Sequence, residues 1–201
     1  MALISVSNNA LSNISVLPDA IPTGALVLLS TQTASSSASL SFTSGIDSTY
    51  DSYVFKFIDI HPSADNAGFQ FNMSTDGGSN YNVTKTTTFF RAYHNESDTE
   101  TALEYQTAHD LAQGTGYQTI LNEVGADNDQ SCSGTLQLFN PSSGTFVKHF
   151  IANGNVYNSS NYSINYYVAG YGNTTSAVNA VSFKFSSGNI DDGIIKMYGV
   201  K

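Results

Sequence analysis

The sequence predicts an all-β fold: an antiparallel two-sheet sandwich of jelly-roll type, preceded by an extended N-terminal arm. The 201 residues include 12 Phe and 12 Tyr but no Trp, and Phe, Tyr, Thr and Val favour half-buried pleated sheets. Apolar residues alternate with polar ones over stretches of strand length. Gly, Asn, Ser and Pro gather between these stretches, with no sign of strands alternating with helices.

The first element is the arm, residues 1–24. Asn and Ser interrupt its apolar residues without a regular period, and Pro18 and Pro22 exclude a helix at its end. Because this segment has no core of its own, we expect it to dock on a partner surface. The alternative is a strand and loop lying on its own domain. The expected anchoring residues are Leu3, Ile4, Val6, Leu11, Ile14, Val16 and Leu17.

Residues 25–201 are expected to form one β-sandwich domain of nine or ten strands. In one of them, Ile164, Tyr166 and Val168 share a face, which predicts a buried Tyr166 with Tyr167 on the opposite face. Asp76-Gly77-Gly78 and Asn153-Gly154 suggest hairpin turns. Strands are expected over 25–30, 39–43, 53–60, 69–73, 135–138, 146–151, 164–168, 181–186 and 194–200.

A long excursion at about 95–130 interrupts this pattern. Its start is acidic and polar, the segment 101–112 could form one or two helical turns, and 117–121 could form a strand. Long excursions on a β-sandwich are often functional or interfacial. The excursion is too short for a second domain.

Charge excludes several classes of partner. The chain has 7 basic and 16 acidic residues, a formal net charge of −9, and about a third of it is Ser, Thr and Asn. With Arg91 as its single arginine, it cannot build the basic patch that nucleic acids or anionic membranes require. Residues 1–22 contain no Lys or Arg, so we expect no signal peptide. No apolar run is long enough for a membrane-spanning helix.

No residue pattern predicts an enzyme, a metal site or a cofactor. The four histidines lack metal-ligand spacing, and Cys132 has no partner for a disulfide. The acidic pairs Asp127-Asn128-Asp129 and Asp191-Asp192 are best explained as turns, because neither fits a calcium loop. No nucleophile elbow or phosphate-binding loop is present.

Four tyrosines could bind a glycan or form an interface. Tyr157, Tyr162, Tyr167 and Tyr171 lie close together in the sequence among several Asn residues. Exposed aromatic faces and amide side chains are suited to sugars. Strand packing or a subunit contact is the favoured role for these residues, because the neighbouring Tyr166 is expected to be buried and Trp is absent.

Several segments of the sequence resemble those of structural proteins from marine tailed bacteriophages. These segments are 46–55 (IDSTYDSYVF), 74–81 (STDGGSNY), 134–141 (GTLQLFNP) and 183–199, and the resemblance runs from about Gly24 to near the C-terminus. The arm, with NNALSN at 8–13, is similar to N-terminal anchors of phage appendages and decoration proteins. The resemblance implies a trimeric β-sandwich held on the particle by its N-terminus, and no catalytic residues.

We therefore expect a bacteriophage virion structural protein, either a compact decoration (cement) protein or a short head or tail appendage. It is expected to be made in the host cytoplasm and displayed on the particle surface. Its expected partners are itself, as a homotrimer, and the major capsid protein or a tail or portal component. The alternative is a receptor-binding module of the tail-fibre-tip type that recognises host surface carbohydrate.

Overall fold

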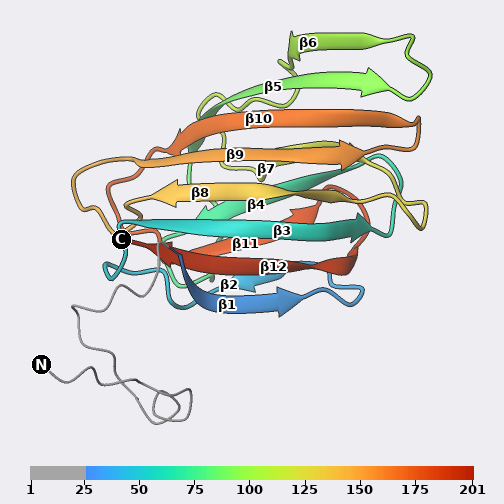
Figure 1. Cartoon of the computed structure of the whole chain (residues 1–201). Helices are drawn as coiled ribbons and strands as arrows, with labels where there is room; N and C mark the ends of the chain where they lie inside the picture. Colours follow the sequence, from blue (N-terminus) through green and yellow to red (C-terminus); the bar gives the residue numbers. More distant parts are fainter. Residues whose placement is uncertain (1–25) are drawn as a thin grey trace, which may run out of the picture.

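A computed structural model describes residues 26–201, and within this range the chain forms twelve β-strands and no helix (Figure 1). No described element is therefore a helix long and apolar enough to cross a membrane. The expected arm, including all seven anchoring residues, lies outside the described residues. The strands are β1 (Val27–Thr33), β2 (Leu40–Phe42), β3 (Ser52–Pro62), β4 (Ala67–Ser74), β5 (Lys85–Asn95), β6 (Thr101–Tyr105), β7 (Gln118–Val124), β8 (Cys132–Phe139), β9 (Lys148–Tyr157), β10 (Tyr162–Gly172), β11 (Ala180–Phe185) and β12 (Ile190–Val200).

The strands form two antiparallel sheets that pack face to face, which confirms the predicted sandwich. The larger sheet has the order β1-β12-β3-β8-β9-β10-β5-β6, and the smaller has the order β2-β11-β4-β7. Within the described chain only the β5–β6, β8–β9 and β9–β10 connections join neighbours in one sheet, and the others cross between sheets. Most strand pairs are therefore distant in sequence, and the sheets depend on non-local contacts.

Aromatic side chains fill the space between the sheets. Phe183 on β11 lies at the centre and contacts the rings of five other phenylalanines. Those rings come from β2, β3 and β4, so both sheets contribute to the cluster, and edge-to-face pairs dominate it, as aromatic quadrupoles favour. All six rings are at most 3% exposed; the five partners are Phe42, Phe55, Phe57, Phe69 and Phe71.

Alternation along β10 follows the prediction. Ile164, Tyr166 and Val168 are at most 2% exposed, whereas Tyr167 is 41% exposed. Since every second residue of a strand shares a face, Tyr167 and Tyr171 lie on the outer face of the larger sheet. The predicted split between a buried Tyr166 and an outward Tyr167 is confirmed.

The expectation of helical turns in 101–112 was wrong. Thr101–Tyr105 forms β6, the edge strand of the larger sheet, which pairs with β5 from Phe90↔Tyr105 to His94↔Thr101. The remainder, 106–112, is irregular. Pairing with β5 supplies the backbone hydrogen bonds that an isolated short helix would have had to make alone.

The two predicted hairpins were also misplaced. Asp76-Gly77-Gly78 connects β4 to β5, which belong to different sheets, and Asn153-Gly154 lies inside β9. Gly154 is needed there because a Cβ would meet the Ser133 carbonyl oxygen at 2.7 Å, so this glycine permits close strand approach rather than a turn. The β9–β10 hairpin turns instead at 158–161.

Candidate functional site

A polar cleft lies where the smaller sheet stops short of the larger one. Strand β7, at the edge of the four-stranded sheet, faces β9 and β10. Strands β5 and β6 extend the larger sheet beyond this cover (Figure 1). The inward positions of this overhang carry polar side chains, notably Arg91 and Glu104, instead of the apolar residues found deeper between the sheets.

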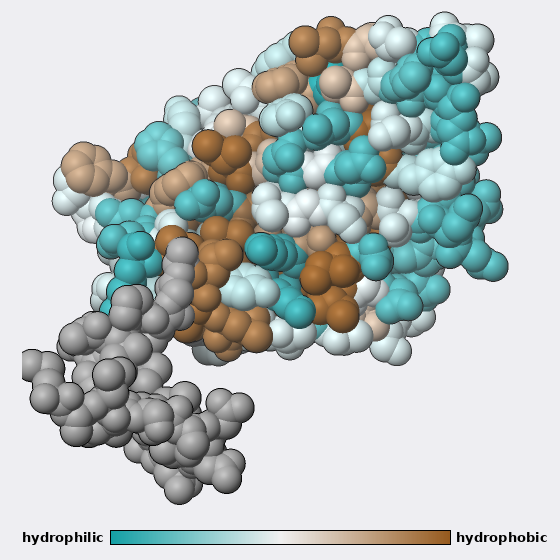
Figure 2. Space-filling view, viewed as in Figure 1, coloured by the Kyte–Doolittle hydropathy of each residue, from teal (hydrophilic) through white to brown (hydrophobic). Residues whose placement is uncertain are grey.

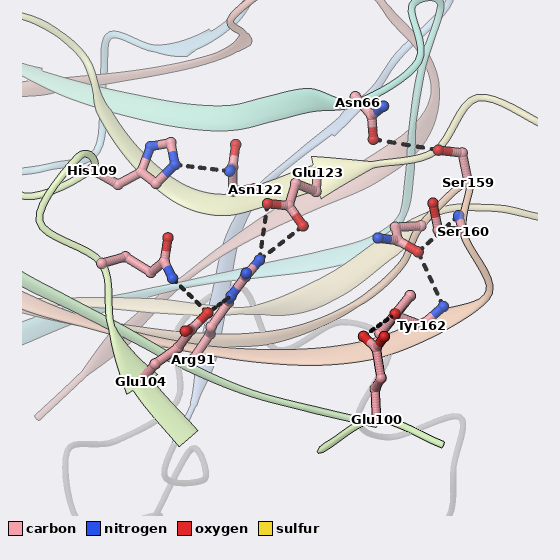
Figure 3. A network of polar contacts seen from close by, with 12 residues as sticks. Asn66, Arg91, Glu100, Glu104, His109, Asn122, Glu123, Ser159, Ser160 and Tyr162 are labelled. Carbon is pink, nitrogen blue, oxygen red and sulfur yellow. Dashed lines mark hydrogen bonds and ion pairs between the residues drawn. The ribbon is translucent and has the colours of Figure 1, made fainter. Parts of the chain in front are cut away.

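Arg91 on β5 is the centre of the cleft (Figure 3). Its Nε donates to Glu104 Oε1 on β6 at 2.8 Å, and its Nη1 donates to both carboxylate oxygens of Glu123 on β7 at 2.9 and 2.8 Å. Partial burial opposes the charge of the guanidinium, but its hydrogen bond to Glu104 and the negative charge of Glu123 raise the pKa of Arg91 above its ordinary value. The guanidinium also lies 5.0 Å from the centre of the Tyr93 ring. Arg91 thus joins the two sheets by ion pairs.

Glu123 reaches Arg91 from a strained backbone. Its φ is 57°, in the left-handed region that residues other than glycine seldom adopt. The β4–β7 register is irregular at this point, so β7 is bulged where it meets the cleft. The adjacent Asn122 side chain lies 3.0 Å from His109 Nε2. Burial lowers the pKa of His109, which favours its neutral form in this contact.

The other wall of the cleft comes from the start of β10 and the turn before it. The Tyr162 hydroxyl donates to Glu100 Oε2 at 2.5 Å, and this hydrogen bond raises the pKa of Tyr162. Asn158 Oδ1 accepts from the backbone N–H groups of Ser160 and Tyr162, which fixes the turn. The cleft has a volume of about 230 Å³; its lining residues are Arg91, Tyr93, Glu100, Glu123, Asn158, Ser160, Tyr162 and Ile164.

The cleft is built from hydrogen-bonding groups. Two carboxylates, from Glu104 and Glu123, hold the Arg91 guanidinium, and a third, from Glu100, accepts from the Tyr162 hydroxyl. The rings of Tyr93 and Tyr162 pack edge to face at 5.6 Å. Carboxylate acceptors, hydroxyl donors and aromatic edges suit a ligand with several hydroxyl groups. In the described part of the chain, no three His, Cys, Asp or Glu side chains are arranged to hold a metal ion.

The structure separates the four tyrosines that the sequence grouped. Tyr162 lines the cleft, whereas Tyr157, Tyr167 and Tyr171 lie on the outer face of the larger sheet. Tyr157 donates its hydroxyl to Asn161, and Tyr171 packs against His149. The Tyr167 ring is stacked on Phe90 at 5.1 Å and 10°, so one of its faces is already covered by Phe90.

The sequence pattern does not reveal most of the cleft, because it hides strand β5. The segment KTTTFFRAYHN alternates between inward Thr87, Phe89, Arg91 and Tyr93 and outward residues, but the run of three threonines and the Phe-Phe pair hide that period. A signal was available in Arg91, the single arginine of an acidic chain. The sequence does not show, however, which of the sixteen acidic residues the fold brings to this arginine.

Comparisons with protein-family models, with curated protein sequences and with solved structures found no match for this chain. The likeness to phage structural proteins therefore remains a prediction from the sequence.

Proposed function

We propose that this protein is a structural component of a bacteriophage particle, a surface decoration protein or a short head or tail appendage. The observation that supports the proposal best is an apolar half of the outer face of the larger sheet. The described chain begins beside this half, because β1 is the edge strand next to β12. Figure 2 shows brown, hydrophobic atoms gathered toward the ends of β8, β10 and β12, and teal atoms toward the opposite ends.

The composition of this half favours a contact role. Its outward residues follow from strand alternation and cross-strand pairing, and none of them is acidic in a chain of net charge −9. Two of them, Leu28 and Ile151, are 52% and 53% exposed. An apolar surface without like charges is suited to contact with other protein. The outward residues are Leu28, Val54, Phe139, His149, Ile151, Ala169, Tyr171, Tyr198 and Val200, together with the uncharged polar residues Ser52, Thr86, Thr88 and Gln137.

Attachment to the particle would occur through the N-terminal segment. Its apolar residues, Leu3 to Leu17, would be buried on docking, and burial contributes about 25 cal/mol per Å² of apolar surface. In a homotrimer three such segments act together, and linked weak contacts give persistent attachment. The major capsid protein or a tail or portal component is the proposed docking partner.

Particle incorporation tests this function. The full chain carrying Leu11→Ser, Ile14→Ser and Leu17→Ser is compared with a control carrying Asn8→Ser and Asn9→Ser, each produced in cells that assemble the particle. We expect the control to sediment with particles and the apolar triple variant to stay in the supernatant. Equal incorporation of both proteins would refute attachment through the apolar residues.

A second candidate function is binding of a host surface saccharide in the polar cleft. The observation in its favour is the set of hydroxyl, carboxylate and amide groups around Tyr93 and Tyr162 in a volume of about 230 Å³. Binding to bacterial polysaccharides is measured for the wild type, for Tyr162→Phe and for the control Tyr157→Phe. A saccharide that binds the wild type and the control but not Tyr162→Phe would support the cleft. A wild type that binds none of the polysaccharides would refute this function.

A further inference from the structure

The apolar half of the outer face contains a hole with a small residue at its centre. Ala169 on β10 pairs with Thr88 on one side and Ile151 on the other. Along β10 its outward neighbours are Tyr167 and Tyr171, since alternate residues share a face. A methyl group thus lies among four larger side chains. An open groove with a volume of about 470 Å³ lies over Ala169 on the side of Tyr171, and its lining includes Thr88, Ile151, Phe139, His149 and Gly170 but not Tyr167.

A knob projects from the same end of the sheet. The β8–β9 connection reaches beyond the neighbouring strand ends (Figure 1), and within it Phe146 is 67% exposed. The knob and the groove are close along the chain, because His149, which pairs with Tyr171 at the groove, follows Phe146 by three residues. Phe146 nevertheless does not line the groove of its own copy.

The backbone that presents Phe146 is held in place. Ser143 Oγ accepts the N–H groups of Thr145 at 3.2 Å and Phe146 at 2.9 Å. From beneath, Lys148 Nζ donates to the carbonyl oxygens of Ser143 and Phe146. Lys148 is fully buried. A buried amine is thus used to fix a loop that exposes a phenyl ring, and such a fixed loop loses little conformational entropy on binding.

Charge favours a second copy of this chain as the occupant of the groove. The protein is acidic overall, and another copy meets the least repulsion at the half of the outer face that has no acidic residue. Lys56 on β3 and Lys196 on β12 lie opposite each other in the strand register, and they border this half with positive charge. The same end of the sheet presents both a knob and a hole, so each copy can supply one to a neighbouring copy and receive the other.

We infer that Phe146 of one copy inserts into the groove over Ala169 of a second copy. The inference gives a contact for the homotrimer that is part of the proposed function, and it rests on that function only for the expectation that the chain self-associates. A phenyl ring seated in an apolar pocket has the character of an interface hot spot, whose truncation weakens association by about 30-fold or more.

Sedimentation velocity of the full chain over a dilution series tests the contact. We expect the wild type to form an assembly larger than the monomer. Phe146→Ser should shift its dissociation to at least about 30-fold higher protein concentration. Ala169→Leu should weaken association by the same factor, because the larger side chain fills the groove. Leu103→Ser is the matched control, because Leu103 is 74% exposed on β6 of the same face but lies away from the groove. This control should assemble like the wild type.

A wild type that stays monomeric throughout the series would overturn the inference, and so would a Phe146→Ser protein that assembles normally. These outcomes are separate from failure of the proposed function. A chain that assembles through Phe146 but never joins particles would refute the particle role alone. A chain that joins particles, but whose self-association is unchanged by Phe146→Ser, would refute this contact alone.

Discussion

Lys85 offers a direct test of the buried polar structure. It lies at the start of β5 and is fully buried. Its Nζ donates to Asn72 Oδ1 at 2.6 Å and to the Val83 carbonyl at 2.7 Å. None of the ion pairs in the described part of the chain includes Lys85. Desolvation therefore disfavours the ammonium form and lowers the pKa of Lys85 to about 8.

The magnitude follows from linkage between protonation and folding. Lys85 has an ordinary value of 10.5, which we take for the unfolded chain. Between pH 8 and 10.5 the unfolded chain holds the proton while the folded chain has released it, so the free energy of unfolding rises with pH across this window. Below pH 8 both states are charged and the full cost of burying the charge remains. Because one pKa unit is worth about 1.36 kcal/mol, the total gain is about 3 kcal/mol.

Denaturant unfolding of the wild type and of Lys85→Met at pH 7 and pH 10 measures this gain. Methionine keeps most of the apolar stem and removes the titrating group. Tyr53 and Tyr166, whose pKa values are raised by burial, contribute equally to both proteins and cancel in the comparison. We expect the wild type to gain about 2–3 kcal/mol relative to Lys85→Met between the two pH values. Coincident pH profiles would show that Lys85 is not desolvated as the fold indicates.

Two further predictions concern the cleft and the buried thiol. Glu123→Gln removes the charge that Arg91 holds across the two sheets and should lower the free energy of unfolding by about 2 kcal/mol, as measured by urea denaturation, whereas the exposed Asp51→Asn should leave it unchanged. Cys132 is 1% exposed, and burial raises the pKa of its thiol, so a thiol reagent should label the native protein far more slowly than the protein in guanidinium. Rapid labelling without denaturant would contradict the packing around Cys132.

Local pattern predicted most strands because burial of one face repeats every second residue. The inward Ile164, Tyr166 and Val168 show this clearly. The pattern failed for Thr101–Tyr105, whose alternation is weak because an edge strand buries little on either face. It also failed at Asn153-Gly154, where the sequence of a tight turn occurs within a strand. A glycine selected for close strand approach and one selected for a turn look the same in the sequence.

Composition and the two-residue hydrophobic period were enough to predict the all-β class, because both act through local burial. Which residues share a site depends on the tertiary structure. Arg91 meets Glu123 because β5 and β7 belong to different sheets that face each other. Ala169 becomes a hole only between the side chains of β5 and β9. Such sites depend on strand order and register, which non-local hydrogen bonds set and which no single segment encodes.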